Sequence, residues 1–269
     1  MEKEERRSPL KEEPLPLAGE YNREKFHEIL VEDFLPLLAG AIFLWVFTCL
    51  EWFSYVINLP RSPWTHTLVA VVFSVWVYFR WKKIKMKAKN YWMGAKGEVV
   101  VGQLLEGLRV RGFVPIHDIP CQSQKGKRFN IDHVLVGPKG IFAIETKTWR
   151  KGKGMQTINL VNGHLLANGK EYNLAPIMQV KNNAEYLANI LSKRMGENFS
   201  VDAVLVFPDW FVEPSAQSLA KRDYQVLMLN PKALDGFLSN YSDILSKEKV
   251  AHLVATLSAY VHEEVARQE

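Results

Sequence analysis

Two carboxylates and a lysine stand close together in residues 130–147, which read NIDHVLVGPKGIFAIETK. Two apolar runs are joined there by Gly-Pro-Lys-Gly, a composition typical of a β-hairpin with a tight turn. With the Pro-Lys pair at the turn, counting outward along the two strands places Asp132 opposite Glu145. Lys147 follows Glu145 by two residues, so its side chain is expected on the same face of the sheet.

This arrangement predicts a particular chemistry. Carboxylates that face each other across a strand pair are about 4.5–5.5 Å apart at Cβ and repel. A divalent cation between Asp132 and Glu145 would remove the repulsion, and Lys147 beside it would orient or help to deprotonate a water molecule and stabilise negative charge on a phosphate. The three side chains therefore predict a metal-dependent phosphodiesterase site with Mg²⁺ or Mn²⁺ as cofactor. The same residues leave open an ordinary surface pair of strand acids matched by lysines.

The spacing resembles the Asp…Glu-x-Lys core of the PD-(D/E)xK nuclease superfamily and, more narrowly, the nuclease-related domain, NERD. The motifs of that family occur here in order: Gly-x-x-Gly-Glu at 94–98, Ile-Asp-His-Val at 131–134, Gly-Pro-x-Gly-Ile-Phe at 137–142, Glu-x-Lys at 145–147 and Pro-x-x-Gln at 176–179. Each motif alone is weak, and their order and spacing together are specific. The resemblance covers roughly residues 92–210. One departure is Ile131, which stands where the name of the superfamily has a proline.

The resemblance implies a fold and a site. The fold would be an α/β domain with a mixed central sheet flanked by helices, as in restriction endonucleases. The site would consist of Glu98, Asp132, Glu145, Thr146, Lys147 and Gln179. Within it, the Thr146 carbonyl would join Asp132 and Glu145 as metal ligands, Glu98 would reach the same metal from the first helix, and Gln179 would contact the site or the substrate backbone. The partner would be nucleic acid, DNA in the first place. The alternative is a non-catalytic relative that uses this fold to bind nucleic acid or a partner protein.

Helices and strands must alternate to position these residues. Apolar spacing predicts a helix at 95–109, a strand at 112–119 and the hairpin strands after it. Two Asn-Gly pairs predict hairpin turns within 156–172. A helix is expected at 173–194, strands at 201–207 and 225–229, and helices at 231–238 and 241–267. Five segments result: a charged, partly disordered N-terminal segment (1–33), a two-helix transmembrane hairpin (34–82), a basic connector (83–93), the nuclease-related domain (94–230) and a C-terminal helical segment (231–269).

The transmembrane hairpin is predicted from two apolar runs. Residues 34–50 and 64–79 carry no charge, and a spanning helix needs roughly 20 apolar residues, range 17–25. Aromatic residues cluster at the run ends, and a block of lysines follows at 80–89. By the positive-inside rule this block is cytoplasmic, which predicts a two-pass protein of a bacterial inner membrane with both termini in the cytoplasm. Buried core helices of a soluble protein are the alternative, the lysine block could also sense lipid headgroups, and an oligomer is left open.

Composition excludes several other functions. The net charge is +5, and the two cysteines, Cys49 and Cys121, do not form a disulfide framework. The chain contains no Walker loop, no Gly-x-Gly-x-x-Gly and no Gly-x-Ser-x-Gly motif, so ATP hydrolysis, dinucleotide binding and serine-hydrolase chemistry are not supported. A zinc site built from His117, Asp118, Cys121 and His133 matches no familiar spacing.

Two further features near the hairpin have less certain roles. His133 alternates to the face opposite Asp132, and we expect it to pack structurally. Trp149, Arg150, Lys151 and Lys153 follow the Glu-x-Lys strand directly. They either grip a nucleic-acid backbone by charge and stacking or form a solvated basic loop, and the sequence favours neither.

Overall fold

The structure is a computed structural model that describes residues 15–57, 59, 62–123, 126–150 and 156–267. It divides into two compact units. The helical unit comprises Tyr21–Ala95, and the α/β unit comprises Lys96–Glu269 together with Met1–Glu20. The expected disordered start and the expected 60–63 turn lie partly outside the described residues.

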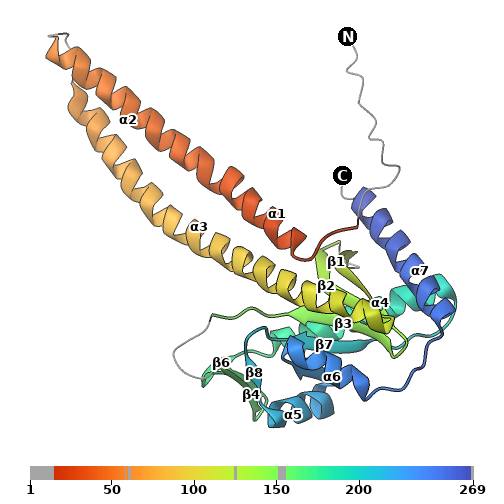
Figure 1. Ribbon diagram of the computed structural model, residues 1–269. Helices are drawn as coiled ribbons and strands as arrows, with labels where there is room; N and C mark the ends of the chain where they lie inside the picture. Colours follow the sequence, from red (N-terminus) through yellow and green to blue (C-terminus); the bar gives the residue numbers. More distant parts are fainter. Residues whose placement is uncertain (1–14, 58, 60–61, 124–125, 151–155, 268–269) are drawn as a thin grey trace, which may run out of the picture. The chain divides into compact units, whose positions relative to one another are not determined.

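Long helices make up the helical unit (Figure 1). The first is continuous through α1 (Glu20–Glu28), a π-helical stretch, η1 (Ile29–Phe34), and α2 (Leu35–Val56). The second, α3 (Pro63–Glu106), returns beside α2. Polar groups hold the two together, because the Trp45 indole donates to the Ser74 hydroxyl at 2.9 Å and the Trp52 indole to the Thr67 hydroxyl at 2.9 Å. Most of the apolar side chains of α2 and of the first part of α3 are exposed.

Only one of the described helices is long and apolar enough to cross a bilayer, the helix Glu20–Val56, whose most apolar window has a mean hydropathy of 2.0 and is 6% buried. This is weak evidence for a membrane span, since core helices and signal sequences pass the same test. The second expected span is not found. The start of α3 contains Trp64, His66 and Tyr78 among its valines, and these lower its hydropathy. Of the predicted two-pass hairpin at 34–82, only the first span is therefore supported among the residues that the structure describes.

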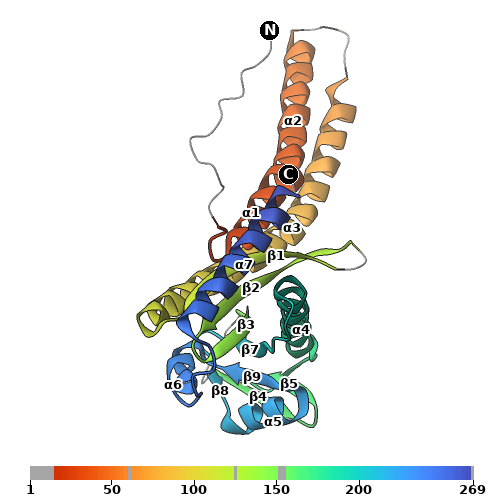
Figure 2. The ribbon, with the colours of Figure 1, turned by 90° about the vertical axis from the view of Figure 1, so that its right-hand side faces the viewer.

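A mixed five-stranded sheet forms the centre of the α/β unit, in the order β1-β2-β3-β7-β9. Its strands are β1 (Val114–Gln122), β2 (Arg128–Gly137), β3 (Gly140–Thr146), β7 (Asp202–Val206) and β9 (Val226–Leu229). The first three pair antiparallel, whereas β3, β7 and β9 pair parallel. The predicted α/β fold with a mixed sheet flanked by helices is confirmed (Figure 2).

Helices cover both faces of this sheet. One core contains buried residues of α4 (Ala175–Met195), α5 (Pro214–Tyr224) and α7 (Lys247–Ala266). The core on the other face contains the end of α3, including Val101 and Leu105, and α6 (Leu234–Ser239). Two short 3₁₀ turns, η2 (Gly107–Arg111) and η3 (Pro231–Ala233), complete the helical elements. The strands of the site hairpin are therefore shielded from water on both sides.

A second, four-stranded sheet has the order β6-β5-β4-β8. Its strands are β4 (Thr157–Val161), β5 (His164–Ala167), β6 (Lys170–Tyr172) and β8 (Phe211–Val212). Both predicted Asn-Gly turns are present, with φ of 48° and 77° in the first pair and 49° and 73° in the second, the left-handed values that a two-residue hairpin turn requires. Strand β8 and helix α5 were not predicted, because two residues are too few to show a period and α5 is mostly polar.

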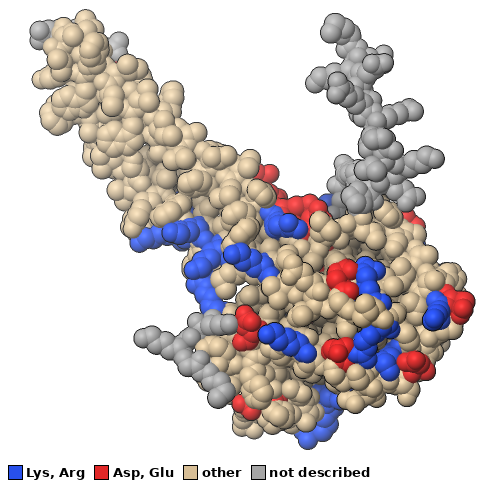
Figure 3. All heavy atoms as spheres, viewed as in Figure 1, with Lys and Arg blue, Asp and Glu red and all other residues tan. Residues whose placement is uncertain are grey.

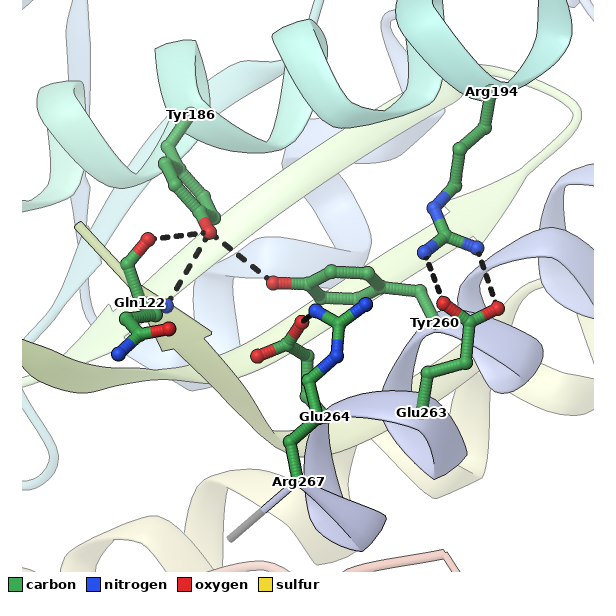
Figure 4. Close-up of polar contacts among 7 residues, drawn as sticks. All are labelled: Gln122, Tyr186, Arg194, Tyr260, Glu263, Glu264 and Arg267. Atoms are coloured by element: carbon green, nitrogen blue, oxygen red, sulfur yellow. Dashed lines mark hydrogen bonds and ion pairs between the residues drawn. The ribbon is translucent and has the colours of Figure 1, made fainter. Parts of the chain in front are cut away.

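The C-terminal helix α7 begins later than expected, at Lys247, where the Ser246 hydroxyl accepts a hydrogen bond from the amide of Lys249 at 3.2 Å. Figure 4 shows how it docks. The Tyr186 hydroxyl of α4 lies 3.2 Å from the Tyr260 hydroxyl and donates to the Gln122 carbonyl of β1 at 3.0 Å. Beside it, Arg194 and Glu263 form a two-pronged ion pair with distances of 3.0 and 2.6 Å. These contacts join α4, α7 and β1 at one end of the sheet.

Candidate active site

The hairpin of β2 and β3 has the register expected from the sequence. Its pairs run from Gly137 with Gly140 to His133 with Ile144. Continuing this register by one step brings Asp132 to the level of Glu145. The amide of Thr146 donates to Asp132 Oδ2 at 2.8 Å, so the Asp132 carboxylate is fixed at the end of β3.

Three acids in this region are almost fully buried. Asp132 is 7% exposed, Glu145 2% and Glu98 4%. Burial raises the pKa of Asp132 well above its usual value, and the charges of Glu145 and Glu98 raise it further. Burial also raises the pKa of Glu145, against the opposing effect of Lys147. Asp132 therefore senses the charge of both other acids. Its register position opposite Glu145 places the two side chains on the same side of the sheet.

Lys147 is the cation among these acids. Its Nζ donates to Glu145 Oε1 at 2.5 Å and to Gln179 Oε1 at 3.0 Å. Burial lowers the pKa of Lys147, but the charges of Glu145 and Asp132 together outweigh burial and leave the pKa above its usual value. The amine is thus protonated at neutral pH. A protonated lysine can orient water and stabilise negative charge on a phosphate, whereas it cannot accept a proton.

Helix α4 supplies two amides to the same carboxylate. Gln179 Nε2 donates to Glu145 Oε1 at 2.7 Å, and Asn183 Nδ2 donates to Glu145 Oε2 at 3.1 Å. The two residues are four apart, so they lie on one face of the helix. Gln179 was expected near the site. Asn183 was not expected there. A residue four positions after Gln179 on the same helix faces the same way, and this spacing could have identified it.

Glu98 comes from α3, and the glycine before it explains how the helix approaches. A Cβ at Gly97 would lie 1.7 Å from the Thr148 hydroxyl, so only glycine allows α3 to pass this close to the chain that follows Lys147. The Gly-Glu pair thus brings the buried Glu98 carboxylate within electrostatic reach of Asp132.

The two histidines form a separate pair. His133 is fully buried, and its Nδ1 lies 2.9 Å from Nδ1 of His117. His117 Nε2 in turn lies 3.3 Å from a Glu106 carboxylate oxygen. Burial lowers the pKa of both histidines, so the pair is neutral at neutral pH. Burial raises the pKa of the Cys121 thiol to about 12, which keeps it protonated.

The Trp149 ring is packed within the protein. It stacks on Tyr172 with a centroid distance of 4.1 Å and an interplanar angle of 12°, and lies 5.1 Å from the Phe207 ring. A ring held in this way is not free to stack on a base. Arg150 is exposed. The other two residues of the proposed nucleic-acid-binding loop, Lys151 and Lys153, lie outside the described residues.

The donor set suits Mg²⁺ or Mn²⁺ in its chemistry. Such cations prefer oxygen ligands, and Mg²⁺ is usually held by one or two carboxylates with several waters. Three buried carboxylates with one lysine carry an excess of negative charge that a divalent cation would neutralise. However, no three His, Cys, Asp or Glu side chains in the described part of the chain are arranged to hold a metal ion together. The amine and amides bonded to Glu145 would have to share that carboxylate with a metal.

Comparisons with known proteins agree with the motifs. Residues 93–208 match the family model of the nuclease-related domain, NERD, close to the range expected from the sequence. An uncharacterised protein of Bacillus anthracis is 29% identical over 58 residues, 22% of this chain and 27% of that protein. The crystal structure of protein VC1899 from Vibrio cholerae is similar with a TM-score of 0.33 and 10% identity, over 93% of this chain and 59% of that one. The chain thus matches about a quarter of the length of the first relative and about three fifths of the second.

Proposed function

We propose that the protein is a metal-dependent nuclease that hydrolyses phosphodiester bonds of nucleic acid, DNA in the first place, and the match of residues 93–208 to the family model of the nuclease-related domain supports this. The observation that carries this proposal is the burial of Asp132, Glu145 and Glu98 around one protonated lysine, Lys147. A fold does not need such a cluster for stability, since each buried acid that repels its neighbours costs free energy. Clusters of this kind are typical of sites that act on charged substrates.

Each residue has a distinct role in this proposal. Asp132, Glu145 and the Thr146 carbonyl would hold Mg²⁺ or Mn²⁺, with Glu98 approaching from the helix side. When bound, the cation would neutralise charge on the phosphate and lower the pKa of a coordinated water. The protonated amine of Lys147 would orient the attacking water and stabilise the extra negative charge on the phosphorus-bound oxygens. Gln179 and Asn183 would keep the Glu145 carboxylate in one orientation.

We also propose that the N-terminal helix attaches the protein to a membrane, the inner membrane in a bacterium. Its support is the exposed apolar surface of α2, where Phe43 is 70% exposed, Phe53 65% and Val46 53%. Soluble proteins rarely expose so contiguous an apolar surface. On the face shown in Figure 3, this part of the helical unit is almost free of charged side chains. If the proposal is right, the full chain stays with the membrane fraction after alkaline carbonate washing, and release into the supernatant would refute it.

The nuclease proposal is tested with the full chain in detergent. Plasmid DNA, single-stranded DNA and RNA are incubated with Mg²⁺, with Mn²⁺ or with EDTA. Cleavage is expected only with the cations and is expected to disappear in Glu145→Gln and Lys147→Met. Glu185→Gln is the matched control, because it removes the same charge as Glu145→Gln from an exposed position on α4. Cleavage that survives in Lys147→Met, or that is lost equally in Glu185→Gln, would contradict the assignment.

A second function follows from one observation. Both oxygens of Glu145 already accept hydrogen bonds from Lys147, Gln179 and Asn183, as expected of a carboxylate with a purely structural role. The protein would then use the fold to bind nucleic acid or a partner protein without cutting. Binding of nucleic acid that does not change with Mg²⁺, Mn²⁺ or EDTA, without cleavage of any substrate, would favour this function over the first.

A further inference from the structure

A groove lies within the helical unit, between α1 with η1 on one side and α3 on the other. Its volume is about 330 Å³, at the lower end of the range for ligand sites. It is lined by Phe26, Leu30, Phe34, Trp81, Ile84, Lys85, Ala88, Lys89 and Trp92. Seven of these nine side chains are apolar, and the only charged ones are two lysines. No acid lines the groove in the described part of the chain.

The two lysines stand four residues apart on α3, so they lie on one face of the helix. Both are exposed. Lys85 Nζ lies 4.7 Å from the centre of the Trp81 ring, which holds the amine at the groove. Lys87 on the same helix points elsewhere and pairs with Asp33 at 3.6 Å. The groove therefore has an apolar floor and an unneutralised pair of positive charges at its edge.

We infer that this groove binds an anionic phospholipid, with an acyl chain on the apolar floor and the phosphate between Lys85 and Lys89. Its place along α3 supports this occupant. The exposed apolar stretch of α3 ends at Phe79, and the six residues to Lys85 rise only about 9 Å along the axis. Aromatic rings such as Trp81 are typical of the headgroup level of a bilayer, and lysines just beyond it attract anionic lipids.

Nucleic acid and free phosphate fit the groove less well. Either would satisfy the lysines, but neither has an aliphatic chain to cover the half-buried Leu30 and Phe34. A single phospholipid supplies both an aliphatic chain for the apolar floor and a phosphate for the two lysines. This inference rests on the proposed membrane attachment and is independent of the nuclease activity.

The test uses the full chain in a neutral detergent and native mass spectrometry to count bound lipids. Phosphatidylglycerol and phosphatidylcholine with identical acyl chains are titrated separately. We expect the wild type to prefer phosphatidylglycerol by about 30-fold, from about 1 kcal/mol per lysine for two lysines. Lys85→Gln with Lys89→Gln is expected to abolish the preference. Both positions are exposed, so the fold is not expected to change.

A matched control separates the groove from general electrostatics. Lys82→Gln with Lys83→Gln removes the same charge from the same helix at exposed positions that do not line the groove, and it is expected to retain the preference. Equal losses in both double variants would overturn the inference, as would competition by inorganic phosphate or by DNA at equal phosphate concentration. A chain that stays in the membrane fraction but shows no preference for phosphatidylglycerol would refute the groove and leave the membrane attachment standing.

Discussion

Replacing Asp132 with asparagine is expected to stabilise the α/β unit at neutral pH while abolishing cleavage. Asparagine keeps the shape of the side chain and an oxygen that can accept the hydrogen bond from the Thr146 amide. It removes a buried charge that Glu145 and Glu98 repel. Residues selected for chemistry at the expense of stability commonly behave in this way.

The size of the gain follows from the charges around Asp132. Two unit charges about 6 Å apart repel by about 3 kcal/mol at an effective dielectric constant of about 20. Asp132 faces two acids and one lysine, Lys147, so one attraction offsets roughly one of the two repulsions. The remaining repulsion is reduced by relaxation of the surroundings. Its removal should raise the free energy of unfolding of Asp132→Asn by about 2 kcal/mol. For a unit of this size that corresponds to a rise in melting temperature of about 4–8 °C.

The pH dependence has a definite sign. The native pKa of Asp132 lies above the unfolded value, so as pH rises above about 4 the unfolded wild type releases its proton first and the native state loses relative stability. The loss ends when pH passes the native pKa. The advantage of Asp132→Asn is therefore absent below about pH 4, where both side chains are neutral, and it grows with pH until the native pKa is passed. Differential scanning calorimetry of the full chain in EDTA from pH 4 to pH 8 measures it.

Adding Mg²⁺ gives an independent check. A ligand at 100 times its Kd stabilises the native state by about 2.7 kcal/mol, and we expect this gain in the wild type and little of it in Asp132→Asn. The two melting temperatures should then converge or change order. An asparagine variant that is less stable than the wild type in EDTA at neutral pH would refute the account of repelling acids.

Other substitutions test the surroundings of the site. Asn183→Ala should raise the pKa of Glu145, shift the acidic limb of the pH–rate profile to higher pH and cost about 1–3 kcal/mol; an unchanged profile would contradict its positioning role. Gly97→Ala should destabilise the protein by more than about 2 kcal/mol in thermal unfolding, because its methyl group would lie 1.7 Å from a threonine hydroxyl. Gly107→Ala is the control: a Cβ there has nothing within 4 Å, so this variant should be neutral or stabilising. Trp149→Ala should lower the melting temperature without weakening DNA binding at a fixed salt concentration, and weaker binding would restore the stacking role.

Local patterns accounted for the parts of the fold that depend on neighbouring residues. The register from Gly137 with Gly140 outward follows from a turn of two residues and the alternation of the strands. The Asn-Gly turns at 162–163 and 168–169 follow from the low cost of left-handed φ in those residue types. In both cases the decisive interactions lie within a few residues of the pattern.

Features that depend on distant segments were not predictable in this way. Asn183 contacts Glu145 only because β7 pairs with β3 and turns a particular face of α4 toward it. The packing of Trp149 on Tyr172 likewise depends on where the second sheet docks, which the predicted hairpin turns within 156–172 do not determine. The second predicted transmembrane span was not found for another reason: a segment without charge need not be strongly apolar, and polar and aromatic residues near Trp64 lower its hydropathy.

The order of the site residues along the chain bears on how the protein folds. Asp132, Glu145 and Lys147 belong to one hairpin, which can close in microseconds, whereas the amides of α4 belong to a later segment. Early in folding, the acids must approach before Gln179 and Asn183 can surround them. Hairpin closure should therefore depend on pH and be faster in mildly acidic solution, where the acids are protonated, so that the cluster affects the folding rate as well as the stability.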